Sequence, residues 1–368
     1  MKDRIYVCHT FYHVYVTCLK ELALPRALRG GATLVLSSMS NDFRDLPERA
    51  ERSGLFEEVL RFDERSFEEF PELVALKRDT GNLLRNLLRR IRFCRRYAAL
   101  EAPFVQVDFR QYRDIYVYCD SDPIGYYLAG NRIRYHALED GLDCLRYYDT
   151  ARYDNRGHFG LKAWMAARGL IFIQNGWSRY CIDMEVNDIS VLPFPCPWYI
   201  EQSREQLAAR LVEEDRRILT ELFLPNRRAL EAKLARAEGS GRPVVLVLTE
   251  PLLPDLGERK RLFLDLIREN REVDGRDGQI VLKPHPRDRL DYAADPDFAY
   301  CVILDAFFPM EVLNLVDGLY FDRVVTVYTV PASLHCAGEK RYLGDDFMDR
   351  YEAPEIHRQN EQIGQVTA

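Results

Sequence analysis

The sequence predicts an α/β protein with two doubly wound domains that face a cleft, each domain being a parallel sheet with helices on both faces. Three observations support this fold class. With 368 residues, the chain is longer than an ordinary domain built on a single hydrophobic core. Short, fully apolar stretches such as 244–248 alternate with charged, amphipathic stretches of helical length, which is typical of buried parallel strands and their crossover helices. The composition, 47% hydrophobic and 30% charged, is that of a globular protein.

Charge and cysteine content restrict the function classes. The net charge of −7 disfavours a general nucleic-acid binder, so no nucleic-acid partner is expected. The nine cysteines are scattered singly without a CxxC pair, which fits neither a disulfide framework nor a zinc site and indicates a reducing cytoplasm. No apolar run approaches the ~20 residues of a membrane-spanning helix, and the N-terminus lacks the pattern of a signal peptide.

We predict that residues 1–200 form the N-terminal domain, which begins with a strand over 4–8 and a helix from Tyr12 to Leu19. Thr10 can cap this helix, whose first amides would then point out above the strand end, where α/β proteins place ligands. His9 lies in the same loop. An equally good interpretation is that His9 and His13 only pack or face water.

Further strands are expected over 32–38, 58–62, 114–119 and 132–138, and the last of them ends in Glu139-Asp140-Gly141. Two carboxylates at a strand end, followed by a glycine that lets the backbone turn sharply, can hold a catalytic base. Adjacent carboxylates are also common in ordinary turns. Asp140 is therefore a candidate base whose role depends on what surrounds it.

The segment Lys77–Arg96 is strongly basic, with Asp79 as its only acid. Apolar residues recur in it at helical spacing, which predicts a basic amphipathic helix: Leu84, Leu87, Leu88 and Ile91. Such a helix is either a solvated face or a docking surface for an anionic membrane or an acidic glycolipid. The sequence favours neither interpretation over the other.

We expect residues 201–242 to be a helical connection, 243–345 to be the C-terminal domain and 346–368 to be a tail. In the C-terminal domain, three strand ends carry polar residues, within 249–255, 283–287 and 328–333. The carboxyl ends of parallel strands lie at one edge of the sheet, where doubly wound proteins bind ligands. These three segments therefore predict one binding site.

The second segment, Lys283-Pro284-His285-Pro286-Arg287, has features of a rigid anion site. Each proline fixes its own φ and pushes the preceding residue towards extended geometry. Two cations flank the histidine, and a phosphate would favour its imidazolium form. The other interpretation is a solvated turn after a strand.

The remaining polar groups at this edge suit a nucleotide. Thr329 and Ser333 offer hydroxyls, and Glu311, at the start of an expected helix, can accept hydrogen bonds from a ribose. The chain has neither a GxxxxGKS loop nor a glycine-rich dinucleotide turn, which disfavours a kinase or a dehydrogenase.

The ordered set Glu139-Asp140-Gly141, the 283–287 segment and a hydroxyl-bearing segment after a late strand resembles the motifs of bacterial sialyltransferases with two Rossmann-like halves (GT-B type). It is most similar to glycosyltransferase family 52, the lipooligosaccharide sialyltransferases. Stretches 8–13, 122–127, 249–252 and 308–311 support the resemblance, which runs from about residue 5 to about 335.

The resemblance implies that His285 contacts the phosphate of the CMP leaving group, as general acid or electrostatic stabiliser. It implies Asp255 as the base, with Asp140 as the rival, while a helix-capping role is the alternative for Asp255. The implied donor-side residues are Thr249, Lys283, Pro286, Arg287, Glu311, Tyr328, Thr329 and Ser333. The implied acceptor-side residues are His9, Thr10, Glu139 and Gly141.

The function implied is that of an inverting sialyltransferase without a metal or other cofactor, since no DxD-spaced carboxylates flank the donor site. It would move sialic acid from CMP-sialic acid to a terminal sugar of a glycolipid or polysaccharide, as a cytoplasmic homodimer at the inner face of the membrane. The chain has Thr329-Val330 where the family has two adjacent hydroxyl residues. A UDP-hexose transferase therefore stays an alternative, as does a non-catalytic nucleotide-sugar-binding module.

Overall fold

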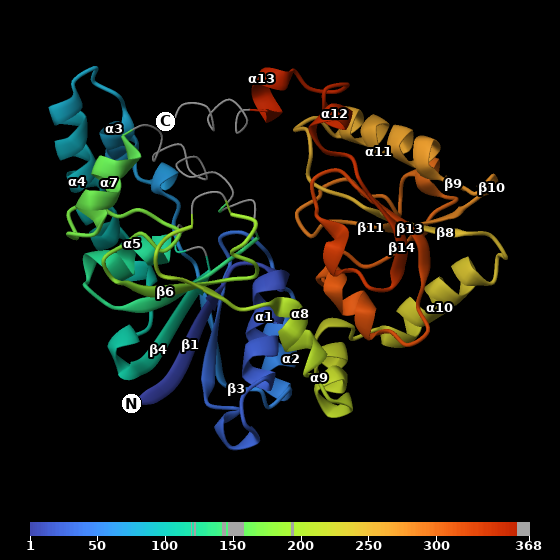
Figure 1. Cartoon of the computed structure of the whole chain (residues 1–368), viewed down its shortest axis with the longest axis horizontal. Helices are drawn as coiled ribbons and strands as arrows, with labels where there is room; N and C mark the ends of the chain where they lie inside the picture. Colours follow the sequence, from blue (N-terminus) through green and yellow to red (C-terminus); the bar gives the residue numbers. More distant parts are fainter. Residues whose placement is uncertain (119, 121–122, 142–144, 146–157, 193–194, 359–368) are drawn as a thin grey trace. The chain divides into compact units, whose positions relative to one another are not determined.

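The computed structural model describes residues 1–118, 120, 123–141, 145, 158–192 and 195–358 (Figure 1). The chain divides into two units, of which the first extends from Met1 to Leu211 and the second begins at Val212. The division falls inside the charged helical segment 201–242.

Unit 1 is built on a seven-stranded parallel sheet in the order β3-β2-β1-β4-β5-β6-β7. The strand order reverses between β1 and β4, which is the switch point of a doubly wound sheet. Ile5 and Val7 are fully buried, as expected for a central strand covered on both faces. The strands are β1 (Lys2–Cys8), β2 (Ala32–Ser37), β3 (Phe56–Phe62), β4 (Tyr112–Tyr118), β5 (Tyr135–Leu138), β6 (Cys181–Val186) and β7 (Tyr199–Glu201).

The helices of unit 1 cover this sheet, and three of them share a second apolar core. Phe93 of α4, Leu73 of α3 and Met165 of α7 belong to this core, and the three helices lie together in Figure 1. The helices are α1 (Phe11–Leu22), α2 (Leu46–Arg52), α3 (Pro71–Lys77), α4 (Leu83–Glu101), α5 (Pro123–Gly130), α7 (Phe159–Ala166) and α8 (Arg204–Ala209). In the part of the chain that the structure describes, no helix is long and apolar enough to cross a membrane.

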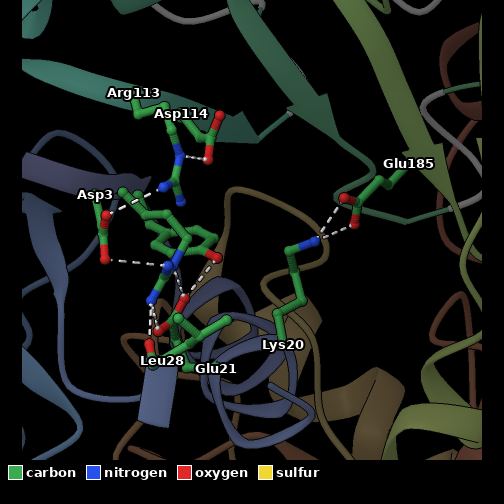
Figure 2. Close-up of polar contacts among 9 residues, drawn as sticks. Asp3, Lys20, Glu21, Leu28, Arg113, Asp114 and Glu185 are labelled. Atoms are coloured by element: carbon green, nitrogen blue, oxygen red, sulfur yellow. Dashed lines mark hydrogen bonds and ion pairs between the residues drawn. The ribbon is translucent and has the colours of Figure 1, made fainter. Parts of the chain in front are cut away.

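A buried ion pair joins the first strand to the first helix of unit 1. The Arg4 guanidinium donates to both carboxylate oxygens of Glu21, at 2.8 and 3.0 Å, and the Tyr6 hydroxyl donates to the same carboxylate at 2.8 Å. Figure 2 shows Glu21 with the backbone carbonyl of Leu28, which also accepts from Arg4. Because both charged side chains are almost inaccessible to water, each depends on the other.

Unit 2 is built on a five-stranded parallel sheet in the order β12-β11-β8-β13-β14, with its switch point between β8 and β13. Its strands are β8 (Val244–Leu248), β11 (Gln279–Lys283), β12 (Val302–Ile303), β13 (Phe321–Thr326) and β14 (Ala337–Tyr342). A short antiparallel pair, β9 (Glu272–Val273) and β10 (Arg276–Asp277), stands apart from this sheet. The helices are α9 (Glu213–Phe223), α10 (Arg227–Glu238), α11 (Leu256–Asn270), α12 (Gly344–Met348) and α13 (Pro354–His357).

Unit 2 differs from the sequence prediction at its end. Residues from 346 were expected to be a tail, yet Phe347 and Met348 of α12 are buried in the core of this unit. Strand β14 was not predicted, because half of its residues are charged and most are exposed, as is usual for an edge strand. The helix expected near Glu311 is a 3-10 helix, Met310–Leu315.

We expect Glu21→Ala to lower the free energy of unfolding by about 3 to 5 kcal/mol, because it leaves a buried guanidinium without its carboxylate. The measurement is denaturant unfolding of the purified protein. Glu58→Ala is the matched control, since Glu58 pairs with Lys2 at 2.6 Å but both side chains are well exposed, and its loss should stay below about 1 kcal/mol. Equal losses in the two variants would contradict the role of the buried pair.

Candidate active site

The central strand of unit 2, β8, is followed directly by Thr249, whose hydroxyl connects two parts of the 283–288 segment. The Thr249 hydroxyl accepts from the backbone N–H of His285 at 3.1 Å and donates to the Asp288 carboxylate at 3.2 Å. Asp288 in turn forms a buried ion pair with Arg259 of α11 at 2.6 Å. The position of the His285 backbone is therefore fixed by β8 and by the helix that follows β8.

The next residue, Glu250, connects β8 to the strand on its other side. Its carboxylate accepts from the backbone N–H groups of Tyr328, at 3.0 Å, and of Thr329. Glu250 is almost fully buried. Its carboxylate thus spans the switch point between β8 and β13, where doubly wound sheets bind ligands. The amides of Tyr328 and Thr329 are therefore bound to Glu250 and not open to a phosphate. The Thr329 hydroxyl is the donor of this segment that a ligand could use.

The His285 ring is held in one tautomer. Its Nδ1 accepts from the backbone N–H of Arg287 at 3.1 Å, so in the neutral ring the proton is on Nε2. Burial, together with the positive charges of Arg287 and Lys283, lowers the pKa of His285 to about 4. At neutral pH the ring is therefore uncharged and has an Nε2–H to donate. The imidazolium form, which the sequence analysis expects when a phosphate is bound, is not favoured by these surroundings.

Lys283 and Phe308 are buried, and Glu311 and Ser333, which are partly buried, lie close enough for the charge of Glu311 to act on Lys283. The Lys283 ammonium lies 4.4 Å from the centre of the Phe308 ring and donates to the carbonyl of Ala306 at 3.4 Å. Burial lowers the pKa of Lys283 to about 8, while the charge of Glu311 opposes the shift. The Ser333 hydroxyl donates to Glu311 at 3.0 Å, and burial raises the pKa of that carboxyl. These four residues connect the end of β11 to the segment after β13.

Asp255 and Arg287 are exposed at the same edge of unit 2. The Asp255 carboxylate caps α11, because it accepts from the backbone N–H of Glu258 at 2.9 Å. The capping role that the sequence allowed for Asp255 is confirmed. Pro286 is partly buried between His285 and Arg287.

Asp140, the rival base, lies in unit 1 at the carboxyl edge of its sheet. His13 Nδ1 accepts from the backbone N–H of His9 at 3.0 Å, so the ring proton is on Nε2, which donates a hydrogen bond to Asp140. The His13 ring is buried and stacks on Tyr118 at a centroid distance of 4.0 Å. The Asp140 side chain is 45% exposed. A rigid, buried histidine thus orients a carboxylate that is open to solvent.

The other predicted acceptor-side residues have structural partners. Glu139 accepts from the backbone N–H of Asn187 at 2.6 Å, and burial raises its pKa. Gly141 has a backbone φ of 150°, which residues other than glycine rarely adopt. His9 Nε2 lies 2.7 Å from the Glu64 carboxylate. Burial alone would raise the pKa of Glu64, but the charge of His9 and the hydrogen bond to it lower that pKa overall.

Thr10 caps α1, as predicted, by accepting from the backbone N–H of His13 at 3.1 Å. The sequence did not single out His13 or Glu64 as site residues. The spacing of four between His9 and His13 was the only local signal, because their carboxylate partners lie 55 and 127 residues away in the chain. In the described ranges, no group of three His, Cys, Asp or Glu side chains could hold a metal ion.

Comparisons with known proteins agree on the architecture. No protein-family model and no curated protein matches the chain. An α/β-galactoside α-2,3-sialyltransferase of the luminous marine bacterium Photobacterium phosphoreum superposes with a TM-score of 0.55 at 9% identity, over 99% of this chain and 96% of that one. The GT-B domain of a Photobacterium damselae sialyltransferase gives 0.55 at 11% identity, over 93% and 90% of the two chains.

This chain has the GT-B fold. Its two doubly wound units are the two Rossmann-like domains of that fold, and the sequence prediction of the fold class is confirmed. The identities are too low to transfer residue roles, so the roles of Asp140, Asp255 and His285 depend on the chemistry of this chain.

Because the pKa of His285 is lowered from 6.5 to about 4 on folding, we expect the free energy of unfolding to fall as the pH is lowered through this range. The unfolded chain takes up a proton on His285 in that range, whereas the folded chain does not. His285→Asn should remove this part of the loss, measured by denaturant unfolding at each pH. In ¹⁵N spectra the wild-type ring should show the Nε2–H tautomer, and a ring that titrates near 6.5 would contradict the assignment.

Proposed function

We propose that this protein is an inverting sialyltransferase that moves sialic acid from CMP-sialic acid to a terminal sugar of a cell-surface glycolipid or polysaccharide. The observation that carries the proposal is the neutral His285 ring, whose Nε2–H is available at the ligand-binding edge of unit 2. The GT-B fold supports glycosyl transfer. The sialyl donor is supported by the three sequence motifs and by the named activity of the Photobacterium proteins.

His285 acts as an electrostatic stabiliser of the leaving group. As the bond between the anomeric carbon and the phosphate oxygen breaks, negative charge grows on the phosphate of CMP, and the Nε2–H donates to it. A proton on Nδ1 would remove the acceptor of the Arg287 amide, so the ring stays neutral through the step. A neutral imidazole can serve in this way when its surroundings hold its pKa low.

Asp140 is the base in this proposal. Inversion requires a carboxylate that removes the proton from the acceptor hydroxyl as its oxygen bonds to the anomeric carbon. Asp140 is exposed and oriented by His13, whereas the Asp255 carboxylate is used to cap α11. Glu139 next to it stays bound to the Asn187 amide and supports the turn.

We expect Asp140→Asn to lower the rate of transfer by at least about 1,000-fold, within the range for loss of a positioned base. Asp255→Asn is the matched control, because asparagine also caps helices well, and it should keep nearly wild-type transfer. His285→Ala should cost about 100- to 1,000-fold in kcat. The assay is sialyl transfer to a lactose acceptor. An inactive Asp255→Asn protein with normal stability, together with an active Asp140→Asn protein, would make Asp255 the base.

The donor can be identified by thermal shift with CMP, UDP and GDP. A nucleotide at 100 times its dissociation constant stabilises the folded state by about 2.7 kcal/mol. We expect CMP to stabilise most, and CMP-sialic acid to release CMP when an acceptor is present. Preferential stabilisation by UDP would support the UDP-hexose alternative, and CMP binding without transfer or hydrolysis would support a non-catalytic binding module.

A further inference from the structure

Helix α4 of unit 1 has an exposed apolar group at its N-terminal half. Its inner face is buried, with Phe93 and Tyr97 in the core that α3, α4 and α7 share. Leu84, Leu88 and Leu83 are 72%, 67% and 58% exposed. Apart from Met1, these are the most exposed large apolar side chains among the residues that the structure describes. Three neighbouring aliphatic side chains in water are unfavourable unless a partner covers them.

The arginines of α4 divide into two groups. One group is bound within unit 1: Arg89 donates to backbone carbonyls of α3, Arg90 to the carbonyl of Phe172, and Arg96 pairs with Glu72. The other group consists of Arg85, Arg92 and Arg95, which are exposed and form no ion pair within 4 Å with any described residue. Arg96 and, more weakly, the charge of Arg92 lower the pKa of Glu72.

Two of the exposed leucines and two of the exposed arginines of α4 lie along one stripe. Leu84, Leu88, Arg92 and Arg95 follow one another at spacings of four, four and three residues, which places them on one face of a helix. The stripe is aliphatic at its start and cationic further along. The acidic protein as a whole, with a net charge of −7, thus has a local surface that combines apolar and positive side chains.

Helix α7, which shares the core with α4, adds a second amphipathic element. Leu161 and Trp164 are 45% and 50% exposed. The Arg168 guanidinium lies over the Trp164 ring, 3.9 Å from its centre. Tryptophan is enriched at membrane interfaces, where its ring meets the acyl chains and its N–H meets water and headgroups.

We propose that α4, together with α7, docks the protein on an anionic lipid surface. The three leucines of α4 enter the boundary of the acyl chains, and Arg85, Arg92 and Arg95 bind lipid phosphates. The combination of exposed leucines, a tryptophan and cations on amphipathic helices is typical of proteins that lie on a membrane without crossing it. This inference does not depend on the proposed transfer reaction, although it would bring the enzyme to a glycolipid acceptor.

The test is sedimentation of the full-length protein with vesicles of phosphatidylcholine alone or mixed with phosphatidylglycerol. We expect binding to the anionic vesicles, weak binding to the neutral ones, and a loss of binding at high salt. Leu84→Ser/Leu88→Ser should weaken binding at least tenfold, and Arg85→Gln/Arg92→Gln/Arg95→Gln should do the same. Since all five side chains are exposed, circular dichroism should show both variants folded.

Two control variants separate this surface from general effects of charge and exposure. Arg210→Gln/Arg217→Gln/Arg228→Gln removes three exposed arginines elsewhere, and Leu28→Ser removes a leucine that is 50% exposed. Both should bind like the wild type. Quenching of tryptophan fluorescence by brominated lipid should be lost in Trp164→Phe.

Three outcomes would overturn the docking proposal: no binding of the wild type to anionic vesicles, equal losses in the arginine variant and its arginine control, or salt-independent binding. If the leucine variant failed to fold, the comparison of the arginine variant with its arginine control would decide whether this surface binds lipid. The vesicles contain no donor or acceptor, so these outcomes are independent of whether the protein transfers sialic acid.

Discussion

The site of unit 2 depends on the Thr249-Glu250 pair at the end of β8. One side chain binds the backbone at His285 and the other binds the backbone at Tyr328 and Thr329, so the two strands that flank β8 are held by adjacent residues. Because β8 is the central strand, this pair sets the distance between the two halves of the ligand-binding edge. A hydroxyl and a carboxylate in these positions satisfy amides that would otherwise be unpaired at buried strand ends.

The two units carry opposite chemistry at their sheet edges. In unit 1, burial and neighbouring acids raise the pKa of Glu139, and Asp140 beside it is exposed and accepts a hydrogen bond from Nε2–H of His13. In unit 2, burial and neighbouring cations lower the pKa of His285 and burial lowers that of Lys283. Environments that shift acidic and basic groups in opposite directions are what proton transfer and leaving-group stabilisation require.

Strands β1 to β5, β8, β11 and β13 and the three polar strand ends could be predicted because apolar runs and breaks are local properties of the sequence. The caps at Thr10 and Asp255 follow from the same local logic. The role of Glu250 could not be predicted from the sequence. Its partners are backbone amides 78 and 79 residues further along the chain, and every residue type except proline has such an amide. Strand β14 was missed because an exposed, charged edge strand lacks the apolar pattern that identifies buried strands.

The tautomer of His285 depends on the proline that follows it and on the turn that the folded backbone makes there. Pro286 has no N–H, so the first amide after His285 that can donate is that of Arg287. The rigid turn between the two residues brings that amide to Nδ1. A residue other than proline at 286 would add a competing donor and more backbone freedom, and both would loosen the ring. The second proline therefore helps to fix the proton on Nε2 as well as stiffening the loop, and burial together with the charges of Arg287 and Lys283 keeps the ring neutral.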